Sequence, residues 1–222
     1  MQNSVIKHIN SSSEINSINY LNQTIEIKKK NFEKYDGQFD DVFNGYDKIQ
    51  LSRKGVFDNF DASLEMGMLS AIAWGFQKGT RPGGKTLHPF LENFSDIANV
   101  LKRIMAEGLN EVSFNELNVH KNVKNGVTTK LLYFSKSIVN NSHCLIYDSR
   151  VKAYLEEFRP IEFNKTLAVM KKWQAQPTFD LYKNYCEEAQ VCAEQNGLSS
   201  AAIEMFMFTA APGKRPAQHI IK

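Results

Sequence analysis

Lys130 and Asp148 are the two residues whose types and spacing best suit covalent chemistry. Lys130 ends the segment 126–130 (GVTTK), and Asp148 lies 18 residues further along the chain. A lysine amine attacks an electrophile only when it is unprotonated, and its ordinary pKa of about 10.4 keeps it protonated near neutral pH. The surroundings of Lys130 must therefore lower its pKa if it is to act as a nucleophile.

Two features around Lys130 are predicted to lower that pKa. Thr128 is a suitable N-cap, which would place Lys130 in the first turn of a helix, where the positive end of the helix disfavours an ammonium. The neighbouring Leu131, Leu132 and Phe134 can exclude water from the amine. The segment is thus suited to hold an unprotonated lysine.

Asp148 stands where the N-cap of the next helix is expected, because Val151, Leu155 and Phe158 mark an apolar face directly behind it. Backbone N–H donors and the positive helix end favour the charged carboxylate at such a position. A fixed negative charge would stabilise a cation that develops at the reacting centre and could help to orient the amine. Each residue alone has a plainer meaning, a surface lysine and a capping aspartate.

A tight turn is expected just before Lys130. The dipeptide Asn125-Gly126 readily supplies the positive φ that such a turn needs. The amides of Gly126, Val127 and Thr128 would then lie at a helix N-terminus, where they can hold a phosphate. The turn would therefore bring an anion next to the lysine.

Basic residues gather in two loops that could bracket a phosphate backbone. They are Lys78, Arg81 and Lys85 in one loop and His120, Lys121, Lys124, Lys130 and Lys136 in the other. The net charge of +3 decides little, because many enzymes have a similar value. From charge alone, a solvated surface is the commoner meaning of such groups.

Apolar residues recur at helical spacing along most of the chain after residue 60. Helices are expected at about 61–79, 95–108, 128–140, 148–160, 163–173, 177–196 and 199–209, with a short one near 113–116. We see no alternating apolar stretch long enough to demand a sheet. The fold class is therefore predicted to be mainly α.

The chain is predicted to form one compact unit with three parts. Residues 1–60 form a helical or irregular segment that packs on the core, residues 61–210 form the core, and residues 211–222 form a basic tail. Because no stretch approaches 18 apolar residues, we expect neither a membrane span nor a membrane partner. A cytoplasmic monomer is expected.

Three cysteines, Cys144, Cys186 and Cys192, form no C-x-x-C pair, and their odd number fits reduced thiols. They are too few for the four thiolates of an iron–sulfur cluster within one chain. His120 and His143 lack the partners and the spacing of a metal site. We therefore expect no metal and no cofactor.

The pattern G-V-x-T-K in a hairpin, followed by an apolar segment and D-x-x-V, resembles the helix-hairpin-helix DNA glycosylases. It is similar to the 8-oxoguanine DNA glycosylase branch, in particular to its bacterial members. Ala73-Trp74-Gly75 before a glycine-rich basic loop, and the helix Glu204 to Phe208, add to the resemblance, which covers roughly residues 61–210. The hairpin departs from it, since it has the sequence Asn-Gly-Val-Thr-Thr where many relatives have a second glycine.

The resemblance implies a helix-hairpin-helix glycosylase-like fold in which Lys130 attacks C1′ of the damaged nucleotide, expels the base and forms a Schiff base that permits strand cleavage. Asp148 would support that chemistry. The partner would be duplex DNA with a damaged or modified base, placing the protein at the nucleoid. The expected DNA-binding residues are Gly126, Val127, Thr128, Thr129 and Lys124, and the expected base-pocket residues are Phe134, Trp74 and Phe208, for which core packing is the alternative.

The expected activity is excision of 8-oxoguanine with an associated lyase step. Two alternatives stay open. The base could be another modified one, such as a base carried by foreign DNA, because the residues that select it are not recognisable in the sequence. The protein could also be a helical DNA-binding module without catalytic activity that uses the same hairpin to grip phosphates.

Overall fold

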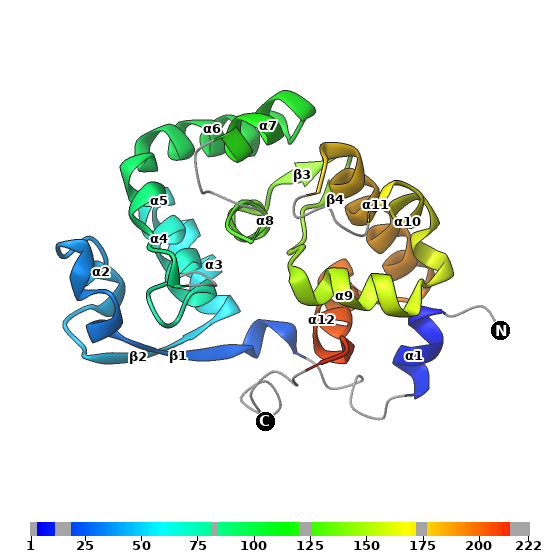
Figure 1. Cartoon of the computed structure of the whole chain (residues 1–222), viewed down its shortest axis with the longest axis horizontal. Helices are drawn as coiled ribbons and strands as arrows, with labels where there is room; N and C mark the ends of the chain where they lie inside the picture. The colour runs from blue at the N-terminus through cyan, green and yellow to red at the C-terminus, as the bar shows by residue number, and fades with distance from the viewer. Residues whose placement is uncertain (1–3, 12–18, 81–83, 120–125, 172–176, 214–222) are drawn as a thin grey trace.

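The computed structural model of the chain describes residues 4–11, 19–80, 84–119, 126–171 and 177–213. The fold is mainly α, as the sequence predicts, with two small antiparallel hairpins. Figure 1 shows two groups of helices, one around α3, α4 and α6 and one around α9, α11 and α12, with the short helix α8 between them. Among the described residues, no helix combines the length and the apolar composition needed to cross a bilayer.

The N-terminal part contains the strands that the sequence analysis missed. After the short helix α1 (Val5–Ser11) and the 3-10 turn η2 (Tyr20–Asn22), β1 (Thr24–Lys28) pairs with β2 (Lys48–Ser52). The two strands are antiparallel. Between them, the one-turn helix α2 (Asp40–Phe43) packs its Phe43 against Phe32 in an aromatic cluster.

Helices α3 (Arg53–Ala62) and α4 (Leu64–Gly75) pack closely against each other. Ser63 separates them and caps α4, because its hydroxyl accepts a hydrogen bond from the Met66 amide at 3.0 Å. Gly67 allows the close approach, since a Cβ there would lie 2.6 Å from the Phe60 Cα. Helix α3 runs across residue 60, so the chain is continuous in structure where the sequence analysis placed a boundary.

The remaining helices of this group follow after the glycine-rich loop. They are α5 (His88–Glu92), α6 (Phe94–Glu107) and α7 (Glu111–Val119). Helix α6 is strongly amphipathic: Ile97, Leu101 and Ile104 are buried at helical spacing.

The second group consists of four helices and the N-terminal helix that packs on them. The four are α9 (Ser149–Phe158), α10 (Asn164–Val169), α11 (Phe179–Gln195) and α12 (Ser200–Ala210). Helix α1 is attached to this group by a hydrogen bond from the Val5 amide to Glu162, which lies between α9 and α10, at 3.0 Å. The two ends of the described chain therefore pack on the same group.

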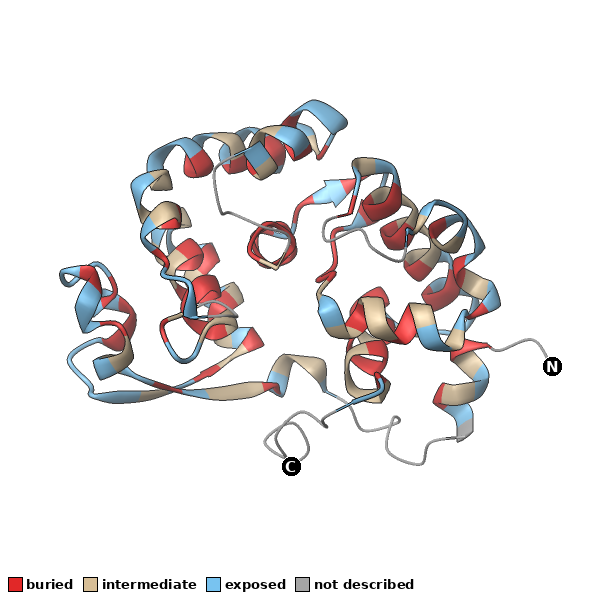
Figure 2. Ribbon diagram, viewed as in Figure 1, coloured by how far each residue is buried: buried red, intermediate tan, exposed pale blue. Residues whose placement is uncertain are grey.

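Helix α8 (Thr128–Phe134) is the element that the two groups enclose. All seven of its residues are buried, and Figure 2 shows the helix buried on every side. It ends earlier than predicted, because a hairpin of β3 (Ile138–Val139) and β4 (Ser142–His143) follows it. Asn140 and Asn141 form the two-residue loop of that hairpin with φ of 46° and 65°, a conformation that asparagine tolerates well.

Candidate active site

Lys130 is the third residue of α8 and is 8% exposed. Its Nζ donates a hydrogen bond to the Gly126 carbonyl at 2.9 Å. Within the described ranges it forms no ion pair with a carboxylate. A lysine that is buried without a paired charge is unusual, because transfer of an ammonium from water costs free energy that such a site does not return.

The C-terminal end of α4 forms the wall against which the Lys130 side chain lies. A Cβ at Gly75 would meet the Lys130 Cδ at 2.8 Å and Cε at 2.9 Å. The ammonium position is also 5.7 Å from the centre of the Phe76 ring. Gly75 is thus required for the path of the lysine, and Phe76 covers its end.

The pKa of Lys130 is lowered from the ordinary value of 10.5, and burial is the main cause. The negative charges of Asp148 and Glu204 oppose the shift, while the positive charge of Arg53 adds to it. The predicted loss of water around the amine is therefore present. Gly75, Phe76 and Gly126 are among the groups in contact with the side chain.

Asp148 caps α9, as predicted from the sequence. Its Oδ1 accepts hydrogen bonds from the amides of Arg150 at 2.8 Å and Val151 at 3.1 Å. Such bonds stabilise a carboxylate at a helix N-terminus. Since Asp148 also acts on the pKa of Lys130, the structure brings the two residues into one electrostatic environment.

A pair of hydrogen bonds joins the residues that precede Lys130 and Asp148. The Thr129 hydroxyl accepts from the Tyr147 amide at 3.2 Å and lies 3.4 Å from the Tyr147 carbonyl, to which it donates. Both groups are buried. The first turn of α8 is therefore fastened to the segment that leads into α9.

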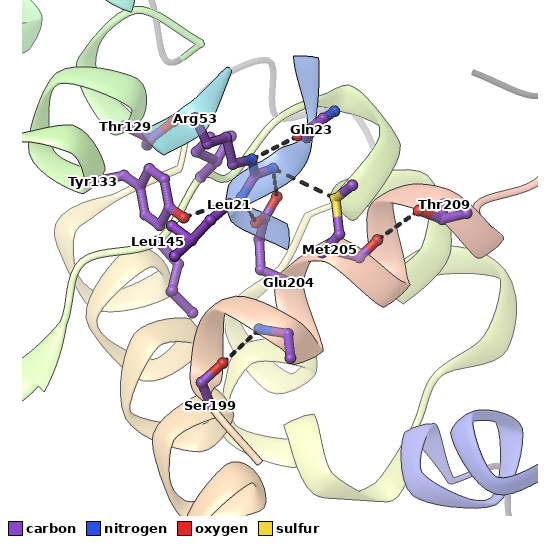
Figure 3. Close-up of polar contacts among 12 residues, drawn as sticks. Leu21, Gln23, Arg53, Thr129, Tyr133, Leu145, Ser199, Glu204, Met205 and Thr209 are labelled. Carbon is purple, nitrogen blue, oxygen red and sulfur yellow. Dashed lines mark hydrogen bonds and ion pairs between the residues drawn. The ribbon is translucent and has the colours of Figure 1, made fainter. Parts of the chain in front are cut away.

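A buried ion pair lies next to this arrangement. Arg53 of α3 and Glu204 of α12 are 1% and 0% exposed, and their Nη1 and Oε2 are 2.6 Å apart. Figure 3 shows the guanidinium held by Glu204, Gln23, Tyr133 and Met205. Because Arg53 lies on α3 and Glu204 on α12, the ion pair connects the two helix groups beside α8.

The turn before α8 differs from its prediction. Val127 occupies the N-cap position, and Thr128 is the first helical residue, because its hydroxyl donates to Asn118 of α7 at 3.1 Å. Gly126 does not adopt a left-handed φ. A Cβ there would lie 3.6 Å from the Lys130 Nζ, which is an ordinary van der Waals distance.

Burial limits which of the predicted DNA-binding residues can contact a phosphate. Val127, Thr128 and Thr129 have at most 1% of their surface exposed, so in this conformation they cannot touch a phosphate. Gly126 is half-buried and retains accessible surface. Lys124, the fifth residue of the predicted DNA-binding set, lies outside the described residues.

The three predicted base-pocket residues have different surroundings. Phe134 is fully buried and packs edge-on against Trp74 at 5.4 Å, so the alternative of core packing is the one observed. Trp74 is 5% exposed, and its Nε1 has no hydrogen-bond partner among the described residues. Phe208 is half-buried under the Arg150 guanidinium, whose Cζ is 5.1 Å from the ring centre.

The sequence analysis missed four residues of this site. Phe76 and Arg53 carried no assigned role, and Gly75 and Glu204 were noted only as part of a resemblance. One signal was available for Glu204, because it is a single carboxylate in the apolar run 201–208. A charge in such a run must be buried and therefore needs a partner. No comparable signal marks Arg53, which stands beside the exposed Lys54.

Comparisons with known proteins give one result. A family model described as "Putative 8-oxoguanine DNA glycosylase OGG-like protein" matches residues 19–208. The matched range runs from η2 to near the end of α12 and contains both Lys130 and Asp148. Neither the curated proteins nor the solved structures give a match.

Proposed function

The chain belongs to the family of 8-oxoguanine DNA glycosylase OGG-like proteins, whose model spans residues 19–208, and from this membership we propose a base-excision reaction in which Lys130 is the nucleophile. The substrate is duplex DNA with a damaged or modified base, and 8-oxoguanine is the base to test first. One observation carries the assignment. Lys130 is a buried amine with a lowered pKa, without an ion-paired carboxylate among the described residues.

The reaction begins with attack of the Lys130 Nζ lone pair on C1′ of the extruded nucleotide. A bond forms between Nζ and C1′, the N-glycosidic bond breaks, and its electron pair leaves with the base, which takes up a proton. The nitrogen then loses a proton, and the C1′–O4′ bond of the sugar ring breaks. Its electron pair goes to O4′, which takes up a proton, and C1′ is left doubly bonded to Nζ. This Schiff base permits elimination of the 3′ phosphate, which is the lyase step.

Asp148 supports the first step by its negative charge. The sugar becomes electron-poor as the base departs, and a fixed carboxylate stabilises that positive charge. Two amides hold the Asp148 Oδ1, so the carboxylate has little freedom to move. It acts here as an electrostatic partner and forms no bond to the sugar.

Trp74 is the residue that we assign to the base pocket most directly. Its indole N–H is buried without an acceptor among the described residues, and an unpaired buried donor costs about 1–3 kcal/mol. A carbonyl oxygen of an extruded base would supply that acceptor. Phe208 is the second candidate, because its ring is only half-buried.

The test is single-turnover excision on a panel of duplexes that differ only in one modified base. Excision of 8-oxoguanine by the wild-type chain and its loss in Lys130→Gln would support the proposal. Excision of a different base with the same dependence on Lys130 would correct the substrate and keep the mechanism. Binding to every duplex without excision of any base would favour the non-catalytic module and overturn the proposal.

A further inference from the structure

The Arg53–Glu204 ion pair is the most deeply buried charged contact in the described part of the chain. Glu204 accepts from Arg53 Nη1 at 2.6 Å and from Nη2 at 3.3 Å. Gln23 accepts from Arg53 Nε at 2.6 Å, and Met205 sulfur accepts from Nη2 at 3.7 Å. These acceptors come from two separate parts of the chain, Gln23 and the adjacent Glu204 and Met205 (Figure 3).

Stability alone does not explain such a pair. Removal of two charges from water costs several kcal/mol per ion, and apolar residues of similar volume stabilise a core equally well or better. The neighbours of the pair are indeed apolar: Ile203, Met205 and Phe206 are all buried. The presence of this ion pair in an apolar core therefore calls for an explanation in the residues that contact it.

Two aromatic residues connect the pair to Lys130. The Arg53 Cζ lies 5.2 Å from the Tyr133 ring centre and 5.4 Å from that of Trp74. Tyr133 also accepts a hydrogen bond from Arg53 Nη1 at 3.2 Å, and it follows Lys130 by three residues on α8. Trp74 directly precedes Gly75, which contacts the Lys130 side chain. The guanidinium thus sits between the two residues that flank the lysine.

Resting on the proposed role of Lys130 as a nucleophile, we propose that Arg53 and Glu204 form a positioning pair. Through Tyr133 and Trp74 the pair fixes α8 against α4, and its two opposite charges set the electrostatic balance around the Lys130 amine. Neither residue bonds to the substrate. Their task is to hold the lysine in place and to set the charge around its amine while the site stays dry.

Among the described residues, the charges that act on Lys130 come from three elements. Asp148 lies at the start of α9, Glu204 on α12 and Arg53 on α3, whereas α4 contributes the uncharged Gly75 and Phe76. Burial lowers the pKa of Lys130, Asp148 and Glu204 raise it, and Arg53 lowers it, with the contribution of Glu204 larger than that of Arg53. Loss of the Glu204 charge must therefore lower the pKa of Lys130 further.

The test measures the titration of Lys130 directly, without DNA. Lysine side chains are labelled with carbon-13, and the Lys130 signal is the one that disappears in Lys130→Gln. In Glu204→Gln, the Lys130 signal is expected to titrate at a lower pH than in the wild-type chain. Glu188→Gln is the matched control, because Glu188 binds the N-terminus of α10 and is not among the charges that act on Lys130.

A second variant keeps the test decisive if Glu204→Gln does not fold. Arg53→Met combined with Glu204→Leu removes both charges and leaves none unpaired. Because the Glu204 contribution is the larger, the Lys130 midpoint of this double variant should fall between those of the wild type and Glu204→Gln. A double variant that folds and titrates at the wild-type pH or above it would overturn the proposal.

The outcomes separate this inference from the proposed function. A Lys130 midpoint that is unchanged in Glu204→Gln, or raised, would show that the pair is only structural. A lowered midpoint in a chain that excises no base would support the pair and refute the glycosylase. If the pair acts on Lys130 and the chain is a glycosylase, the pH profile of the excision rate should also shift. Its acidic side should move to lower pH in Glu204→Gln by the same amount as the Lys130 midpoint.

Discussion

The Thr129 hydroxyl and the Tyr147 main chain form two hydrogen bonds, with the amide at 3.2 Å and the carbonyl at 3.4 Å. This contact joins the residue before Lys130 to the residue before Asp148. The contact fastens the first turn of α8 to the segment that leads into α9, and both partners are buried. The catalytic geometry that we propose therefore depends on a side chain that does no chemistry itself.

Thr129→Val is expected to slow excision while leaving DNA affinity nearly unchanged. Valine has the shape of threonine but leaves the buried Tyr147 amide without its acceptor, which should cost about 1–3 kcal/mol of stability. Denaturant unfolding and single-turnover rates measure the two effects. Thr166→Val is the matched control, since Thr166 is equally buried and loses a bond to Glu188 at 2.7 Å. Equal rates in both variants would refute this role of Thr129.

Gly75→Ala should damage activity more than stability. A Cβ at this position would lie 2.8 Å from the Lys130 Cδ, so the flexible lysine must move and the backbone need not. Alanine also favours the helix by roughly 0.5–1 kcal/mol. We expect an unchanged or higher melting temperature and a rate reduced on the order of 100-fold, because a displacement near 1 Å has that effect.

Gly67→Ala provides the contrast to that variant. Its Cβ would meet the Phe60 Cα at 2.6 Å, which is backbone and cannot move easily. This substitution should destabilise the fold by about 1–3 kcal/mol. A Gly75→Ala chain that unfolds like Gly67→Ala would mean that Gly75 serves packing and not the path of the lysine.

Asp148 should show separate capping and electrostatic roles. Asn is as good an N-cap as Asp, so Asp148→Asn should keep the stability of α9 and lose the negative charge. We expect excision to slow on the order of 100-fold, the effect of removing one preorganised group. Asp148→Ala should lose about 1 kcal/mol of stability in addition. Equal stability losses in both variants would indicate that the cap depends on the charge.

Burial of the Lys130 amine predicts a pH-dependent gain in stability from Lys130→Met. The pKa of Lys130 is lower in the folded chain than the ordinary 10.5, so between the two values the unfolded chain binds more protons and wild-type stability rises with pH. Methionine removes this penalty. Its advantage should be fully present below the folded pKa and vanish above 10.5. Urea unfolding at several pH values checks it, and a gain that is independent of pH would contradict it.

Local sequence rules predicted the Asp148 cap and the position of most helices. A capping residue acts on amides two and three residues away, so its effect is readable in the sequence. The same rule failed at Thr128, where a tertiary bond to Asn118 takes the hydroxyl. Strands β1 and β2 each carry only two apolar residues, Ile25 and Ile27 in β1 and Ile49 and Leu51 in β2, in alternation with polar ones, and this short signal was missed.

Most of the site could not be predicted because its contacts are long-range. Arg53 and Glu204 are 151 residues apart, and nothing near Arg53 in the sequence separates it from a surface residue. Gly75 and Lys130 meet only because α4 and α8 cross. The two candidate residues could therefore be selected from local signals, whereas the surroundings that act on them required the folded chain.

The central claim is that Lys130 is the nucleophile, and borohydride trapping on duplex DNA with 8-oxoguanine tests it most directly. Reduction of the Schiff base should link protein and DNA covalently, and proteolysis followed by mass spectrometry should place the link on the peptide that contains Lys130. Lys136→Gln is the control, because Lys136 is an exposed lysine of the next turn, bound to Asp61 at 2.6 Å. The account predicts trapping in Lys136→Gln and none in Lys130→Gln. A link on any other lysine, or excision that persists in Lys130→Gln, would contradict it.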